Sequence, residues 1–157
     1  MPLNERTINS ARNPQWANYA KTAINLEVDF NELDEEYVDF CAHPDDIVSW
    51  GPELYNRAVA GEFGPVAEFE IPADITGEDA LNLIRLDRDK LLKKEVDPIV
   101  SNPLRWASMT EAKQQEWADY RQALLDLPST QASAYKTFNT TTEDMDWVNL
   151  TLPIKPE

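Results

Sequence analysis

The spacing of apolar residues changes along this 157-residue chain, and the change limits the folds it can adopt. Residues 22–30 alternate strictly between apolar and polar side chains from Thr22 onward, which is typical of a strand with one buried face. Residues 80–96 and 110–127 instead carry apolar residues at helical spacing, which predicts two amphipathic helices. Because strand and helix patterns occupy separate parts of the chain, we predict an α+β fold.

Residues 1–75 are predicted to form a small N-terminal ββαβ subdomain. The strand at 22–30 is followed by an acidic stretch that reads as a turn, and residues 37–42 can return as a second strand. A hairpin is the simplest topology for two such segments. Residues 66–71 are a third candidate strand, which Pro72 stops because it cannot donate a ladder hydrogen bond.

A helix is expected between the second and third of these strands. Pro52 suits a first helical turn, where its missing N–H costs nothing. Gly61 stands where a left-handed residue would end the helix. The apolar stripe of this helix is predicted to consist of Tyr55, Ala58 and Val59.

Residues 76–128 are predicted to form an antiparallel helical hairpin, because a short loop joins the two helical segments. Asp97-Pro98 is expected to end the first helix, since a residue before proline avoids the helical region. Pro128 is expected to close the second helix. The side chains predicted to pack across the hairpin are Trp117, Tyr120 and Leu124 on one helix and Leu81, Ile84 and Leu91 on the other.

Residues 129–157 have no helical period, and we predict an extended C-terminal arm. Large apolar residues, which are costly to leave in water, lie in the loop between the two helices and also in this arm. In the loop, Leu104, Trp106 and Met109 could cover the open end of the hairpin. Trp16, Trp106 and Trp147 are each either a cover over the core or a contact with a partner. The candidate partner-binding residues are Trp106, Tyr135, Phe138, Trp147, Leu150 and Leu152.

The chain is acidic, with 29 Asp and Glu against 14 Lys and Arg and a net charge of −15. Residues 1–75 alone carry a net charge of −11. This balance argues against binding to nucleic acid or to an anionic membrane surface, since both need clustered cations. No segment has the apolar length of a signal peptide or a membrane span, so a cytoplasm-like, reducing compartment is expected.

No catalytic residue, metal site or cofactor is predicted. Cys41 and His43 share a face if they lie on a strand, but a buried thiol beside a strand-end histidine is the commoner outcome. The acidic first hairpin could be a calcium site or a solvated acidic face, and the solvated face is favoured because the spacing of the carboxylates lacks the EF-hand pattern. The glycines form no phosphate-binding motif. The carboxylates of that hairpin are Asp29, Glu32, Asp34, Glu35, Glu36 and Asp39.

Two blocks of the C-terminal half carry a family pattern. Residues 88–97 contain Arg-Asp-x-Leu-Leu and an Asp, and Thr110-Glu111 precedes Trp-x-x-Tyr-Arg-Gln-Ala-Leu-x-Asp-Leu-Pro at 117–128. The chain closes with Trp147 and with Leu-Pro-x-Lys-Pro at 152–156. From residue 81 onward it therefore resembles tail fibre assembly proteins of tailed bacteriophages, of the tail-assembly-chaperone type.

The N-terminal half shows a looser similarity to small phage tail proteins, over residues 40–64. Two positions depart from the chaperone family's pattern. Leu125 stands where arginine is common, and Pro98 replaces a tryptophan that often follows the Asp ending the first helix.

The resemblance implies a binding protein without catalytic residues. Its partner would be the C-terminal part of the receptor-binding tail fibre, a trimer, and its role would be in fibre folding, trimerisation or attachment. It would act in the host cytoplasm during virion assembly or remain on the virion tail. The alternative is a structural virion protein, a fibre adaptor that stays on the particle. A small enzyme is a third class.

Overall fold

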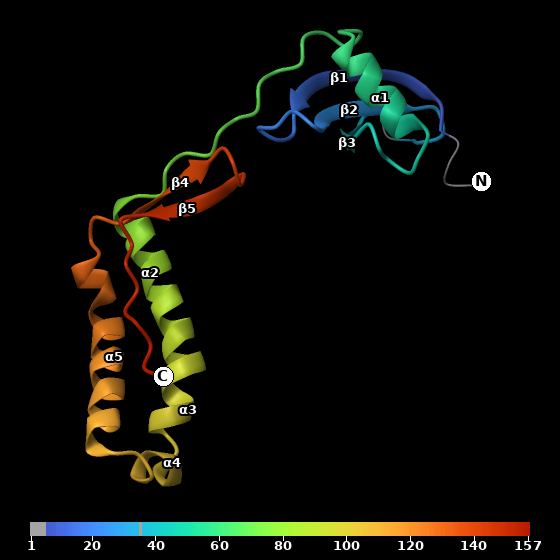
Figure 1. The fold of residues 1–157 in the computed structure, drawn as a ribbon. Coiled ribbons are helices and arrows are strands. Elements are labelled where there is room, and N and C mark those ends of the chain that lie inside the picture. Colours follow the sequence, from blue (N-terminus) through green and yellow to red (C-terminus); the bar gives the residue numbers. More distant parts are fainter. Residues whose placement is uncertain (1–5, 35) are drawn as a thin grey trace. The chain divides into compact units, whose positions relative to one another are not determined.

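The computed structural model describes residues 6–34 and 36–157, and these form a mixed α+β protein, as predicted (Figure 1). The chain divides into two compact units. The N-terminal unit ends at Ile71, and the C-terminal unit runs from Pro72 to Glu157. Each has its own hydrophobic core.

The N-terminal unit is built on an antiparallel sheet in the order β1-β2-β3. These strands are β1 (Ile8–Trp16), β2 (Ile24–Phe30) and β3 (Val38–Ala42). The hairpin predicted at 22–30 and 37–42 is confirmed as β2 and β3. Its alternation works as expected, because one face of β2 is buried in the core. The buried residues of β2 are Ile24, Leu26, Val28 and Phe30.

The first strand, β1, was not predicted. Its register against β2 shifts between Ile8 and Ser10 and again between Arg12 and Gln15, and Asn13 has a positive φ of 54°. Bulges of this kind break the period of two, because an extra residue moves the following side chains to the other face. The strand therefore has no alternation that the sequence could reveal.

The strand predicted at 66–71 is wrong. A single parallel bridge joins Ala67 to Gln15 there. In it, the Trp16 N–H donates to the Ala67 carbonyl at 3.0 Å, and the Ala67 N–H donates to the Pro14 carbonyl at 2.9 Å. The predicted ββαβ order is corrected to βββα followed by an extended segment. Pro65 and Pro72 flank that segment and cannot donate ladder hydrogen bonds.

Helix α1 (Trp50–Val59) covers one face of this sheet (Figure 1). It buries Leu54 and Ala58 completely, whereas Val59, predicted in its apolar stripe, is 53% exposed. The Trp50 ring begins the helix and packs on two sheet residues, with centroid distances of 5.0 Å to Phe30 and 4.5 Å to Phe40. This aromatic contact fixes the start of the helix over the sheet.

Two long helices lie side by side in the C-terminal unit (Figure 1). They are α2 (Gly77–Leu91) and α5 (Glu111–Thr130). Helix α5 begins as predicted, where the Thr110 Oγ1 accepts a hydrogen bond from the Lys113 N–H at 3.2 Å. The predicted packing across the helices is confirmed. Its members in one cluster are Ile84, Trp117, Tyr120 and Leu124, with Leu81 and Leu91 packed against them.

The helix ends differ from the prediction at two prolines. The chain remains helical through Asp97 and Pro98. The π-helix η1 (Leu92–Val96) leads into α3 (Asp97–Val100), where Pro98 lies in the first turn and needs no N–H. Helix α5 runs past Pro128 to Thr130, because a proline this near a C-terminus removes a hydrogen bond of the last turn only. A short helix, α4 (Pro103–Ala107), occupies the predicted loop.

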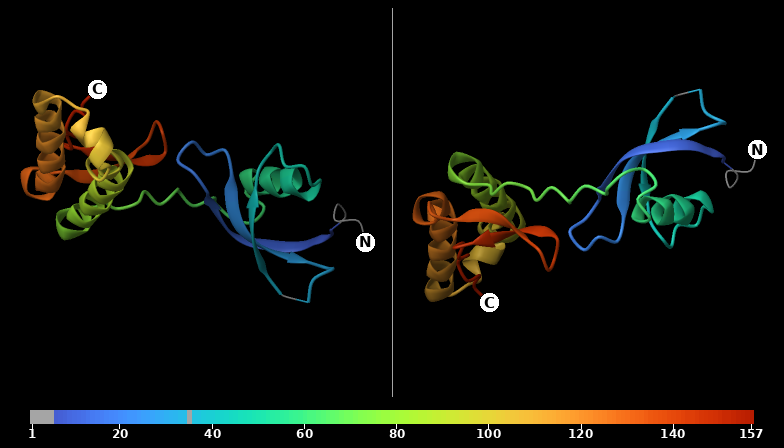
Figure 2. Two further views of the ribbon diagram at one scale, coloured as in Figure 1. Left: turned by 90° about the horizontal axis from the view of Figure 1, so that it is seen from below. Right: turned by 90° about the horizontal axis from the view of Figure 1, so that it is seen from above.

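The extended arm predicted at 129–157 is also corrected, because most of it folds back as a β-hairpin. Strand β4 (Tyr135–Asn139) pairs antiparallel with β5 (Asp144–Val148). The turn is held by the Asn139 side chain, which accepts a hydrogen bond from the Thr141 N–H at 2.8 Å. Figure 2 shows this hairpin beside the two long helices of its unit. Residues 149–157, which follow β5, have no helix or strand.

Gly51 provides a test of the N-terminal unit. It is buried, and a Cβ there would overlap the Asp46 side chain, whose Oδ2 accepts a hydrogen bond from the His43 N–H at 2.9 Å. Gly51→Ala should lower the free energy of unfolding by about 1–3 kcal/mol, the usual cost of overpacking. Chemical denaturation followed by tryptophan fluorescence measures this. In an Asp46→Gly background the same substitution should cost less, and an equal cost would rule out the steric explanation.

A truncation tests the corrected arm. Removing residues 128–157 deletes the buried Ala134 together with Trp147 and Leu150, which pack on the helical core. Losing one such tryptophan costs about 3–5 kcal/mol, comparable to the whole stability of a small domain. Calorimetry should therefore show no cooperative melting of the C-terminal unit. Truncation after Leu152 is the control and should keep it. A folded C-terminal unit in the longer truncation would contradict this packing.

Candidate protein-binding surfaces

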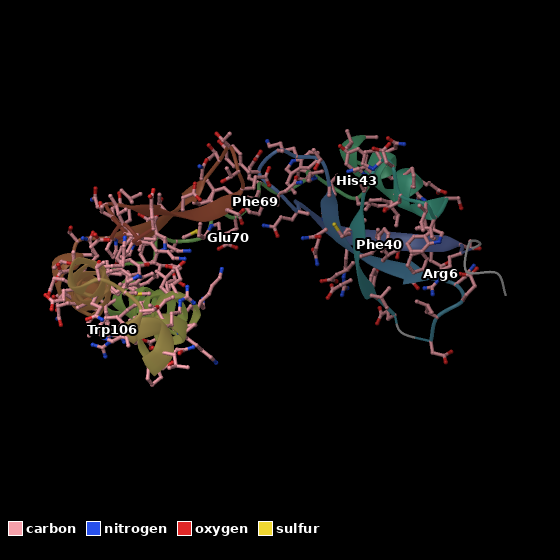
Figure 3. The ribbon with its side chains drawn as sticks, turned by 60° about the horizontal axis from the view of Figure 1, so that its bottom comes forward. Arg6, Phe40, His43, Phe69, Glu70 and Trp106 are labelled. Atoms are coloured by element: carbon pink, nitrogen blue, oxygen red, sulfur yellow. The ribbon has the colours of Figure 1, made fainter. Side chains whose placement is uncertain are left out.

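The six predicted partner-binding residues all lie in the C-terminal unit, but they do not form one surface. Trp106 is on α4, at the end of the helix pair away from the β-hairpin (Figures 1 and 3). Tyr135 and Phe138 are on β4 and Trp147 is on β5. Leu150 and Leu152 follow β5.

Strand pairing sorts the hairpin aromatics onto two faces. Trp147 lies opposite Lys136 and Phe138 lies opposite Met145, so these four side chains share one face. The Lys136 ammonium is 5.2 Å from the centre of the Trp147 ring, a cation–π contact. Tyr135 projects from the other face. The structure therefore brings Phe138 and Trp147 together and separates them from Tyr135.

The three tryptophans left open by the sequence each pack on the core of their own unit. Trp106 and Trp147 contact the helical cluster, and Trp16 contacts the sheet core. The Trp106 carbonyl also accepts a hydrogen bond from the Gln114 side chain at 2.8 Å, which ties α4 to α5. These contacts favour the covering role. Leu104 was expected to share it, but its side chain is 85% exposed.

The most accessible apolar residues of the C-terminal unit include two in its last segment. Leu152 is 49% exposed and Ile154 is 93% exposed. A hollow of about 400 Å³ lies between this segment and one side of α5. It is lined by Glu116, Asp119, Tyr120, Ala123, Pro153, Ile154, Lys155 and Pro156. Ile154 was not among the predicted residues. Its only signal in the sequence is that it is an isolated apolar residue between two prolines.

A hydrogen bond joins the π-helix to α5 beside this hollow. The Tyr120 hydroxyl donates to Glu95 Oε2 at 2.6 Å. Burial and the neighbouring Glu95 carboxylate raise the pKa of Tyr120 to about 12. A phenol with so high a pKa stays protonated at neutral pH, which suits a structural donor and opposes the role of a base.

The Cys41 thiol is exposed, so the buried thiol expected beside His43 is wrong. The alternation of β3 explains this, because Phe40 and Ala42 face the core and Cys41 faces outward. Partial burial of the sulfur and the Asp46 carboxylate raise the pKa of Cys41. The His43 Nδ1 accepts a hydrogen bond from the Asp45 N–H at 3.1 Å. A raised pKa opposes formation of a nucleophilic thiolate.

Two acidic residues of the first hairpin, Glu32 and Glu27, are held by separate contacts. Both Glu32 carboxylate oxygens accept from the Thr7 N–H at 3.0 Å, and this bond lowers the pKa of Glu32. Glu27 pairs with Arg12, which lowers the pKa of Glu27. Across residues 6–34 and 36–157, no three His, Cys, Asp or Glu side chains are grouped to hold a metal ion. Glu35 lies outside the described residues.

The helices that the structure describes include none with the length and apolar character needed to cross a membrane. No protein-family model, curated protein or solved structure matches this chain. What the protein does is therefore inferred from its own surfaces and from the sequence pattern of residues 81–157.

The hydrogen bond between Tyr120 and Glu95 predicts a pH effect. Because the folded-state pKa of Tyr120 lies above the ordinary value of 10, its contribution to stability is complete below pH 10 and is lost as the pH rises through about 12. Tyr120→Phe should lower the free energy of unfolding by about 1.5–3 kcal/mol at pH 7. The difference between wild type and variant should shrink from pH 10 to 12 in urea titrations. A constant difference would contradict the assignment.

Proposed function

We propose that this protein is a phage tail fibre assembly chaperone, which binds the receptor-binding tail fibre and assists its folding, trimerisation or attachment. The sequence pattern of residues 81–157 supports this role. Its most specific block, residues 117–128, supplies the buried stripe of α5. Residues that build a shared core are those that related chains must keep, so the resemblance concerns the scaffold of the C-terminal unit.

The observation that carries the proposal is the pair of exposed apolar side chains in the last segment, Leu152 and Ile154. The tryptophans of this unit and Tyr120 pack in or on its own core, whereas these two side chains are exposed in the segment beside a hollow on α5. Exposed apolar residues around a groove are typical of protein-binding sites. In this proposal the helices of residues 76–128 are the scaffold, and residues 129–157 carry the contact.

Fibre assembly creates a need for such a surface. A fibre chain presents unpaired strands and apolar faces before it trimerises, and these are prone to aggregate. A partner with apolar contacts and a net charge of −15 can cover them while the complex stays dispersed. We place this action in the host cytoplasm during virion assembly, on the C-terminal part of the fibre.

Co-expression with a tail fibre from the same phage tests the proposal. Ile154→Ser together with Leu152→Ser should reduce affinity for the fibre about tenfold or more, because truncating contact residues at an interface centre commonly costs that much. Soluble fibre yield should fall with it. Leu86→Ser is the matched control, since Leu86 is also about half exposed and lies on α2.

The composition of purified phage particles separates the chaperone from a fibre adaptor. A chaperone is recovered with the unassembled fibre and is absent from finished particles, whereas an adaptor is present in them at fixed stoichiometry. If the wild-type protein neither binds the fibre at micromolar concentration nor raises its soluble yield, the proposed function is wrong.

A further inference from the structure

The two outer edges of the N-terminal sheet differ. At the β1 edge, Ala67 bridges to Gln15, and Pro14 and the bulges of β1 interrupt regular pairing. The β3 edge has none of these features, because Val38 to Ala42 pair with β2 in continuous register. Within the described part of the chain, the backbone groups of β3 that face away from β2 make no hydrogen bond. An open, regular edge is a template for another strand.

A groove of about 480 Å³ lies over β3 and the part of β2 that pairs with it. It is lined by Asn25, Leu26, Asp39, Phe40 and Cys41, so it follows β3 and the neighbouring part of β2. Phe40, labelled in Figure 3, is partly buried and touches the Trp50 ring. An added strand would therefore meet an apolar neighbour on one face and Asp39 with Cys41 on the other.

The charges around the edge select the occupant. Asp39 lies within β3, Glu36 precedes the strand, and Asp45 follows it. Among the residues that the structure describes, Asp39 and Asp45 pair with no lysine or arginine, whereas Glu36 interacts electrostatically with Arg12, and His43 Nδ1 lies 3.9 Å from Asp45 Oδ2. They lie in a part of the chain, residues 1–75, whose net charge is −11. Opposite charges across neighbouring strands stabilise pairing, and like charges oppose it.

The same charges argue against a second copy of this chain as the occupant. Pairing β3 with itself would bring together two N-terminal units of the same strongly negative charge, with an Asp39 from each at the shared ladder. A strand with lysine or arginine at alternate positions would instead neutralise this face. Apolar residues at the intervening positions would lie beside Phe40.

We propose that the β3 edge binds an extended peptide segment with alternating basic and apolar residues, by adding it to the sheet as a further strand. The main-chain hydrogen bonds would supply affinity and the acidic side chains would supply selectivity. This inference does not depend on the partner being a tail fibre. Its failure would leave the contact at Leu152 and Ile154 untouched.

The test uses the full chain and a capped nine-residue peptide in which lysine alternates with valine. Amide hydrogen exchange by NMR should show new protection at alternate amides between Val38 and Ala42. Alkylation of Cys41 by iodoacetamide should slow, because the added strand covers the groove. Affinity should fall as salt rises, since the charges are exposed and therefore screened.

Matched variants decide whether the edge is the site. Asp39→Asn should weaken peptide binding about two- to fivefold, as expected for one exposed charge pair, and should flatten the salt dependence. Asp144→Asn, an exposed aspartate on β5 of the other unit, should leave affinity unchanged. The same peptide with glutamate in place of lysine should not bind.

Three results would overturn the proposal. One is peptide binding without protection at residues 38–42, which would show general attraction to an acidic surface. Another is equal protection by the glutamate peptide. The third is protection that rises with protein concentration in the absence of peptide, which would identify a second copy of the chain as the occupant.

Discussion

Two helices cannot by themselves enclose the aromatic stripe of α5, and the rest of the C-terminal unit depends on this constraint. Trp117 and Tyr120 are nearly buried although α2 covers only one side of them. The remaining cover comes from α4, from the β4–β5 hairpin and from the segment after it, which place Trp106, Trp147 and Leu150 on the same core. Covering this core is what folds residues that were expected to form a free arm.

The need to cover this core also determines which apolar residues remain available to bind a partner. Aromatic residues are the usual anchors of protein interfaces, but here Trp16, Trp106 and Trp147 are used to close the cores. The large apolar residues that stay exposed in the C-terminal unit are aliphatic: Leu86 on α2, and Leu104, Leu152 and Ile154 in shorter segments. Whether a large apolar residue is a core residue or a contact residue thus depends on tertiary cover, which composition does not report.

The sequence predicts those elements whose apolar pattern has one uninterrupted period. Ile24 to Phe30 keep a period of two and α5 keeps a helical stripe, and both are found as expected. The bulges of β1 break its period of two, so the sequence does not reveal this strand. Residues 66–71 have strand-like side chains, but the flanking Pro65 and Pro72 have no N–H to donate to a neighbouring strand. In each of these cases the backbone, not the side-chain pattern, decides the outcome.

The ends of the helices and the candidate binding site also depend on features of the fold that the sequence pattern does not predict. Pro98 and Pro128 are tolerated because of where they fall within a turn, and proline alone does not show its helical position. For the site, aromatic content directed the prediction to Trp106 and Trp147, which pack on the core. Ile154 was missed because exposure is a property of the folded chain.

The two proposed surfaces recognise different chemistry, and their difference suits a protein that handles unassembled chains. Contact through Leu152 and Ile154 would depend on apolar burial and would change little with salt. Contact through the β3 edge would depend on backbone hydrogen bonds and on charge, and would weaken as salt rises. An open strand edge is normally a risk of self-association. Here the short length of β3 and the negative charge around it oppose pairing between copies, and these charges favour a strand of opposite sign. An acidic open edge can therefore accept a foreign strand while the protein itself resists edge-to-edge aggregation.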